Sequence, residues 1–284
     1  MNVSVKPLTP HIAVEARGVD LSKALGDNVF KTLYDAFAKH SILLIRDQKL
    51  TPEQHVAFAE RFGELDRHVL TENSLPEQPE IFVVSNIKEK GKFIGRAKAG
   101  WFWHSDFSYQ EIPAQASIMH TLECPDVGGD TMFASAGAAF DALSPTLQRF
   151  LEKLTAIHDF QLGSSRVQNK LNKQQLIKKK HFDDRPPVSH PVVRIHPDTG
   201  RKTLFVDPGY TDYIEQLTRE ESDNMINYLA RHVTQPEFVY RHHWEPGDVL
   251  CWDNRGAWHC AIGDYSDDDR RLMHRVTVKG TATS

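Results

Sequence analysis

Eight short runs rich in β-branched and aromatic residues recur along the 284-residue chain, and they constrain its fold more than any other feature. They occupy residues 41–46, 81–85, 116–120, 192–195, 203–206, 238–241, 249–252 and 275–278. Runs of this length and composition, separated by turn residues, are typical of strands. Their distribution favours a sandwich or barrel over a series of βαβ units. We therefore predict a mainly β fold.

Helices are predicted as insertions between these strands. Thr51-Pro52-Glu53-Gln54 combines an N-cap, a proline at the first helical position and a capping-box glutamine. Ser144-Pro145 repeats the start signal, and Thr218 with Glu221 forms another capping box. We expect these helices to lie outside the sheets and to cover one face.

A polar, lysine-rich stretch at residues 161–190 differs from its surroundings. A long polar insertion between strands is typical of a mobile lid over a site, so a lid is one interpretation. A solvated helix and loop without a role is the other, and the sequence leaves both open. No linker or repeat interrupts the chain, so we expect residues 1–284 to form a single domain.

Charge and cysteine content limit the partners. The formal net charge is −4, so no global basic field indicates nucleic acid or an anionic membrane, and a small-molecule partner is expected. The three cysteines form no CxxC pair, which is typical of a reducing compartment. The chain begins without the apolar run of a signal peptide and contains no apolar stretch of about 18 residues. We expect a cytoplasmic location.

The triplet His104-Ser105-Asp106 is the strongest candidate for a metal site. If this stretch is a strand, the period of two places His104 and Asp106 on the same face. Two imidazoles and one carboxylate are the ligand set that holds non-haem Fe(II) with open coordination positions. A third ligand must then come from elsewhere, and His259, which follows the run at 249–252, is the candidate.

Other histidines compete for this role. His242 and His243 lie in an alternating run that also precedes a turn. A second His-x-Asp sequence, His196-Pro197-Asp198, is followed by Thr199-Gly200, and we interpret its aspartate as a turn former.

Two arginines near His259 favour it over its competitors. Arg271 and Arg275 are four residues apart and would share one face of a strand. The planar guanidinium suits bidentate recognition of a carboxylate, so an acidic cosubstrate at the metal is indicated. A surface ion-pair strip with the aspartates at 267–269 is the alternative interpretation.

Collectively these motifs resemble the taurine dioxygenase group of Fe(II)- and 2-oxoglutarate-dependent oxygenases, which also includes phenoxyacetate dioxygenases. The likeness covers nearly the whole chain. It rests on the motifs at residues 18–21, 44–48, 58–65, 103–106, 128–131, 190–197, 252–255 and 270–275.

The resemblance implies a double-stranded β-helix, a cupin-like jelly roll with peripheral helices. It implies that His104, Asp106 and His259 bind Fe(II), and that Thr131 and Arg271 hold the distal carboxylate of 2-oxoglutarate. Arg275 would lie between this cosubstrate and an anionic substrate. The implied reaction uses O2 to hydroxylate a C–H bond and releases succinate and CO2. Family members are commonly dimers or tetramers, so a homo-oligomer is expected.

The resemblance also implies a set of substrate-binding residues, which are His68, Thr71, Phe107, Phe160, Tyr210 and Arg275. The chain departs from the taurine-specific pattern at Thr71, where a tyrosine is expected, and at Tyr210, where a phenylalanine is expected. Gly100 replaces a polar residue ahead of the metal motif. We predict a small anionic organic substrate, namely a sulfonate, a sulfate ester or an aryloxy or other carboxylate.

Two alternative functions remain at this point. Two histidines and an aspartate also bind Zn²⁺ with an open fourth position, as in zinc hydrolases. A non-catalytic jelly-roll binding protein would retain the fold alone. Neither gives a reason for Thr131 beside the paired arginines.

Overall fold

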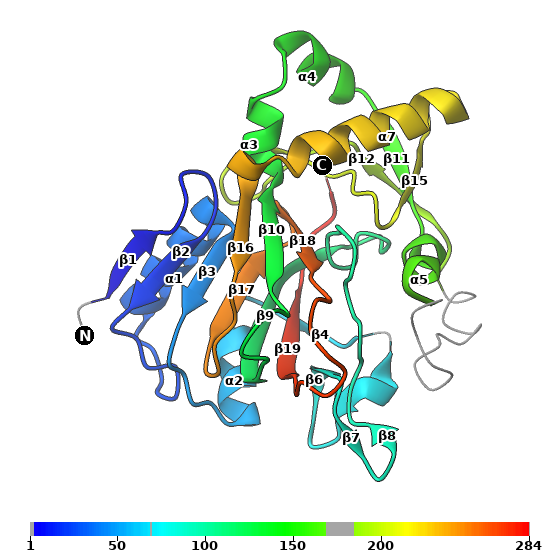
Figure 1. The fold of residues 1–284 in the computed structure, drawn as a ribbon. Helices are drawn as coiled ribbons and strands as arrows, with labels where there is room; N and C mark the ends of the chain where they lie inside the picture. The colour runs from blue at the N-terminus through cyan, green and yellow to red at the C-terminus, as the bar shows by residue number, and fades with distance from the viewer. Residues whose placement is uncertain (1–2, 69, 169–184, 284) are drawn as a thin grey trace.

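A nine-stranded sheet dominates the computed structural model, which describes residues 3–68, 70–168 and 185–283 (Figure 1). The neighbouring strands in order are β1 (Ser4–Pro7), β2 (Val14–Arg17), β3 (Ile42–Ile45), β17 (Val249–Asp253), β9 (Ala114–Glu123), β19 (Leu272–Lys279), β6 (Gln78–Ser85) and β5 (Ser74–Leu75), with β4 (Leu65–Asp66) beside β19. The pairing of β2 with β3 is parallel, and the other recorded pairs in this sheet are antiparallel.

A second, three-stranded sheet packs against the middle of the first. It consists of β16 (Val239–His242), β10 (Thr131–Ser135) and β18 (Ala257–Ala261). An apolar core joins the two sheets and includes Phe133 from β10, Trp252 from β17 and Met273 from β19. The two facing sheets, with helices outside them, confirm the predicted jelly roll.

Two helices cover the other face of the large sheet, α1 (Asp27–His40) and α2 (Pro52–Glu60). Helix α2 begins with the predicted capping box, in which Thr51 and Gln54 each accept a hydrogen bond from the other's backbone N–H. Helix α1 is not predicted by the sequence analysis. Its buried residues Leu33 and Phe37 pack into the same core as Phe58 of α2.

Three further helices surround a separate apolar core at one end of the sandwich (Figure 1). They are α3 (Ala136–Asp141), α4 (Pro145–Leu151) and α7 (Arg219–Val233). Helices α4 and α7 begin at the predicted Ser144 and Thr218 caps, but they do not share a face with α2 as expected. The helices separate because the chain has two apolar cores to cover. One lies beneath the large sheet and is covered by α1 and α2, and the other lies at the end of the sandwich and is covered by α3, α4 and α7.

The remaining elements are short. They are the sheet β12 (Val188–Pro191), β11 (Thr155–His158) and β15 (Thr211–Ile214); the hairpin β13 (Val193–Ile195) and β14 (Lys202–Leu204); the hairpin β7 (Lys88–Glu89) and β8 (Lys92–Phe93); the helix α5 (Phe160–Gln168); and the 3₁₀ turns η1 (Thr71–Asn73) and η2 (Pro236–Phe238).

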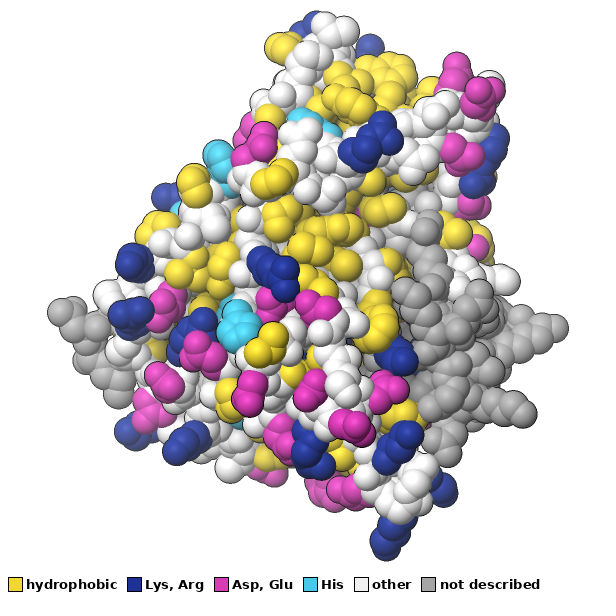
Figure 2. Space-filling view, viewed as in Figure 1, with side chains coloured by type: hydrophobic (Ala, Val, Ile, Leu, Met, Phe, Trp, Pro, Cys, Tyr) yellow, Lys and Arg dark blue, Asp and Glu magenta, His cyan; other side chains and the backbone are white. Residues whose placement is uncertain are grey.

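The stretch at 161–190 is only partly described. Its first residues continue helix α5, its last three lie in β12, and residues 169–184 lie outside the described chain. The lid therefore stays a prediction. No helix in the described part of the chain is both long and apolar enough to cross a membrane. Acidic and basic side chains are interspersed over the face in Figure 2.

Candidate metal centre

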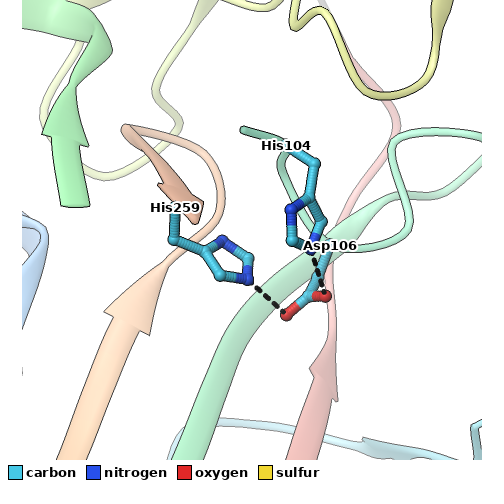
Figure 3. Close-up of side chains that lie close together, drawn as sticks. All are labelled: His104, Asp106 and His259. Carbon is cyan, nitrogen blue, oxygen red and sulfur yellow. Dashed lines mark ion pairs between the residues drawn. The ribbon is translucent and has the colours of Figure 1, made fainter. Parts of the chain in front are cut away.

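His104, Asp106 and His259 lie together and are buried (Figure 3). The Nε2 atom of His104 lies 3.7 Å from Oδ1 of Asp106, and Nε2 of His259 lies 3.8 Å from Oδ2. One possible ligand atom of each residue lies within 4.8 Å of those of the other two. Among the described residues, these three therefore form a cluster that could hold a metal ion. The structure therefore brings together the three predicted ligands.

The local structure around His104 differs from the predicted strand. His104 and His259 exchange both backbone hydrogen bonds, at 3.0 and 2.8 Å, as an isolated antiparallel bridge. Asp106 already lies in a turn, where Phe107 has a φ of 58°. The premise that His104 and Asp106 share the face of a strand is therefore wrong. A turn after the single bridge brings the carboxylate back towards the two rings.

Hydrogen bonding orients the His104 ring towards the proposed metal. Its Nδ1 lies 2.8 Å from the backbone carbonyl of Phe102, so this nitrogen carries the proton and donates it. The other nitrogen, Nε2, faces Asp106 and is the atom available to a metal ion. This arrangement is typical of metal-binding histidines, whose remote nitrogen is fixed by a carbonyl or carboxylate.

The protonation states of the other two residues also suit metal binding. Burial and the adjacent His104 hold the pKa of His259 well below its usual value, so its ring is neutral. Burial alone would raise the pKa of Asp106, but Arg275, whose Nη1 lies 3.1 Å from Oδ1, holds it well below the usual value. Two neutral imidazoles and a carboxylate are the donor set that binds Fe(II) with open positions, so these residues fit that ion.

A cavity opens on one side of these residues and contains the predicted cosubstrate anchors. Its lining residues are Val84, Ala99, Gly100, His104, Met119, Thr131, Trp244, Trp252, His259, Ala261, Arg271 and Arg275. Arg271 is 6% exposed, and its Nε has no hydrogen-bond partner in the described part of the chain. Among the described residues no carboxylate lies within 4.0 Å of it. A buried guanidinium that makes no ion pair with a described carboxylate is a site for a ligand carboxylate.

Trp244 determines how Thr131 can interact with a ligand in this cavity. The indole N–H of Trp244 donates to Oγ1 of Thr131 over 3.0 Å. The hydroxyl already accepts this bond, so its own proton is available to a ligand acceptor. Trp244 was not predicted as a site residue, because it lies far along the chain from Thr131.

A second cavity shares His104 and Arg275 with the first and contains most of the predicted substrate residues. Its lining residues are His68, Leu70, Phe82, Arg96, Lys98, Ala99, Gly100, Phe102, His104, Asp106, Phe107, Tyr109, Phe160, Gly163, Ser164, Tyr210 and Arg275. Thr71 is exposed in η1 and is not among them. Phe82, Phe102 and Tyr109 line the cavity but were not predicted.

Gly100 lines both cavities beside His104. A Cβ atom at this position would lie 3.0 Å from Cε1 of His104, and the φ of Gly100 is +69°. A side chain is disfavoured on both grounds. The glycine at this position therefore has a local structural reason.

His68 presents a hydrogen-bond donor to the second cavity. Its Nδ1 accepts the backbone N–H of Leu70 at 3.0 Å, and its ring stacks on Phe82 with 3.9 Å between the ring centres. Burial, with a further effect of Arg275, holds its pKa well below the usual value. The neutral ring therefore carries its proton on Nε2 and can donate it.

The competing histidines have other roles. His242 lies 3.0 Å from Asp248 and His243 lies 2.9 Å from Asp130, so neither reaches the candidate metal centre. The turn predicted at 196–200 is present between β13 and β14. The Asp198 side chain in this turn accepts a hydrogen bond from Tyr34 at 2.8 Å and forms an ion pair with Arg255, also at 2.8 Å.

Known proteins resemble this chain over almost its whole length. The model of the taurine catabolism dioxygenase TauD, TfdA family matches residues 4–277. An alpha-ketoglutarate-dependent 2,4-dichlorophenoxyacetate dioxygenase of Cupriavidus pinatubonensis is 34% identical, over 98% of each chain. An alkylsulfatase of Acinetobacter baylyi is 30% identical, over 99% of this chain and 86% of its own.

A solved structure agrees with these matches. The crystal structure of a taurine dioxygenase from Burkholderia xenovorans superposes with a TM-score of 0.83 at 32% identity, over 100% of this chain and 93% of that one. These likenesses support neither a zinc hydrolase nor a non-catalytic binding protein. The chain belongs to the taurine catabolism dioxygenase TauD, TfdA family and is a 2-oxoglutarate-dependent dioxygenase that uses Fe(II), 2-oxoglutarate and O2.

Proposed function

We propose that His104, Asp106 and His259 bind the Fe(II), that Thr131 and Arg271 hold the distal carboxylate of 2-oxoglutarate, and that the second cavity receives the substrate. One observation carries this assignment. The buried triad lies where two cavities meet, and His104 and Arg275 line both. A cosubstrate in one cavity and a substrate in the other would therefore both reach the same metal.

The overall reaction is the conversion of R–H, 2-oxoglutarate and O2 into R–OH, succinate and CO2. Bound Fe(II) supplies the activation of O2. The protein binds and orients both organic molecules and excludes water around them. Arg275 connects the two parts of the site, because its guanidinium contacts Asp106 and lines both cavities.

The substrate class follows from the walls of the second cavity. Six aromatic side chains line it, namely Phe82, Phe102, Phe107, Tyr109, Phe160 and Tyr210. Arg275 and the Nε2–H of His68 supply donors for an anionic group. Burial raises the pKa of Tyr109 and Tyr210, so both remain neutral phenols that do not repel an anion. We propose a small carboxylate, sulfonate or sulfate ester that carries an aromatic or bulky apolar group.

A panel of acids tests this substrate class. Consumption of 2-oxoglutarate should be stimulated more by an aryloxyacetate or an aryl sulfonate than by taurine, which is small and carries an ammonium group. Taurine stimulation equal to that of the aryl acids would contradict the proposed pocket chemistry. The dichlorophenoxyacetate dioxygenase, alkylsulfatase and taurine dioxygenase among the relatives set the range of head groups to include.

Substitution of Asp106 tests the metal site, and the chain provides a matched control in its second His-x-Asp sequence. Asp106→Ala should abolish O2-coupled succinate formation. Asp198→Ala should retain it, because Asp198 lies in a turn and pairs with Arg255. Full turnover by Asp106→Ala with iron still bound would contradict the assignment.

Assembly and location are further proposals. Phe150 of α4 and Tyr228 of α7 are each 41% exposed, and hydrophobic side chains gather over this end of the molecule in Figure 2. These exposed hydrophobic side chains support a homo-oligomer, either a dimer or a tetramer, and light scattering would measure its mass.

The three free cysteines support a cytoplasmic location. A single domain over residues 1–284 with a lid at 161–190 is also proposed.

A further inference from the structure

Asn254, in the turn between β17 and β18, uses all four of its polar groups in hydrogen bonds. Its backbone N–H donates to the carbonyl of Gln115 at 2.9 Å, and its carbonyl accepts the hydroxyl of Ser105 at 2.7 Å. Its side-chain oxygen accepts the backbone N–H of Asp106 at 3.1 Å, and its amide donates to Oγ of Ser117 at 3.2 Å. Two of these bonds hold the 104–106 segment directly.

Ser117, on β9, connects Asn254 to the carboxylate of Asp106. Its side chain is fully buried, and Oγ lies 2.7 Å from Oδ2 of Asp106. A hydroxyl has one proton to donate. Because Oγ accepts from the Asn254 amide, that proton is directed to Asp106.

The two oxygens of Asp106 are therefore held from two adjacent strands. Ser117 of β9 donates to Oδ2, and Arg275 of β19 donates to Oδ1. β9 and β19 are hydrogen-bonded neighbours in the large sheet. The donors fix the rotation of the carboxylate relative to the two histidine rings.

The turn that carries Asn254 is itself rigidly held. The neighbouring Asp253 is fully buried and accepts hydrogen bonds from Arg255 at 2.7 and 2.8 Å and from His196 at 2.9 Å. Its backbone N–H donates to the carbonyl of Ser41 at 2.8 Å. These contacts connect the β13–β14 hairpin and the start of β3 to the segment that positions Asp106.

We infer that Ser117 and Asn254 are positioning residues that set the orientation of the Asp106 carboxylate for the metal. This inference rests on the proposed metal site. Neither residue touches the cavities that would receive the organic ligands. Their loss should therefore weaken metal binding, whereas 2-oxoglutarate and substrate recognition should change only through the metal.

Co(II) binding to the full-length apoprotein tests the inference without turnover. Removal of a group that orients a metal ligand typically weakens metal affinity by about 10- to 100-fold, and we expect this range for Ser117→Ala. Ser117→Cys keeps the volume and a weak donor, so it should give an intermediate affinity. The control is Ser85→Ala, because Ser85 is 1% exposed and its hydroxyl, among the described residues, accepts a hydrogen bond from the backbone N–H of Ile87 and contacts none of the predicted metal ligands.

The absorption spectrum of bound Co(II) provides a second readout, because it responds to the ligands around the ion. We expect an altered spectrum in Ser117→Ala and a wild-type spectrum in Ser85→Ala. Thermal unfolding of each apoprotein shows whether the variant folds. If Ser117→Ala does not fold, the affinity and spectrum of Ser117→Cys provide the test. Wild-type affinity and spectrum in the folded Ser117 variants would overturn this inference alone. A wild-type protein that binds no metal would overturn the proposed site as well.

Discussion

Replacement of Arg271 by methionine should separate its role in cosubstrate binding from its effect on stability. The guanidinium is buried, its Nε lacks a hydrogen-bond partner among the residues that the structure describes, and burial lowers its pKa. An unpaired buried cation carries a desolvation penalty that methionine does not. We expect the free energy of unfolding of apo Arg271→Met to be unchanged, or raised by up to about 3 kcal/mol.

Cosubstrate binding should change in the opposite direction. A hydrogen bond to a charged group contributes about 1.5 to 3 kcal/mol, and loss of the upper value corresponds to roughly 100-fold in affinity. The KM for 2-oxoglutarate should therefore rise by about 10- to 100-fold. Arg270→Met is the matched control, because Arg270 is exposed and pairs with Glu123, so its loss should leave this KM unchanged.

Succinate formation at varied 2-oxoglutarate and thermal unfolding of the apoprotein measure the two effects. A KM like that of wild type in Arg271→Met would refute the cosubstrate role. A fall in the apoprotein's Tm by more than about 5 °C would refute the argument that the buried cation lacks a compensating partner.

Three further predictions concern separate parts of the molecule. Trp244→Phe removes the N–H that orients Thr131, so the KM for 2-oxoglutarate should rise about 3- to 10-fold with little change in kcat; an unchanged KM would contradict this role. His68→Leu should raise the KM for the organic substrate and leave decarboxylation of 2-oxoglutarate without substrate unchanged, as succinate assays would show. Burial lowers the pKa of His55 to about 3, so the unfolded chain takes up a proton first as the pH falls from about 7. His55 should therefore contribute about 2 kcal/mol to the fall in the free energy of unfolding between pH 7 and pH 5, and urea unfolding at the two pH values should show a fall smaller by this amount in His55→Gln.

Most of the strands could be predicted because their apolar runs are buried in the two sheets of the sandwich. Residues 249–252 form β17 and residues 275–278 lie in β19, both in the middle of the large sheet. Helix α1 could not be predicted from a start signal. Its N-cap is Gly26, which makes no side-chain cap, whereas Thr51 of α2 makes a capping box. Local signals therefore identify helices only where the cap is a side chain.

The metal ligands could be predicted from residue types and from the family resemblance, but not from local geometry. His104 and Asp106 come together through a turn rather than a strand. Ser117 and Asn254 contact each other across 137 positions in sequence, so no spacing indicates them. The sequence offered one indication of Ser117, which is a serine within the apolar run at 116–120. A hydroxyl buried in such a run needs a hydrogen-bond partner, and here the partner is Asp106.

Anaerobic addition of Fe(II) and 2-oxoglutarate to the apoprotein tests the central claim most directly. When 2-oxoglutarate chelates Fe(II) held by His104, Asp106 and His259, a visible metal-to-ligand absorption band should appear and saturate at one Fe(II) per chain. The band should be lost in Asp106→Ala and retained in Asp198→Ala. No band in the wild-type protein, or an undiminished band in Asp106→Ala, would contradict the account.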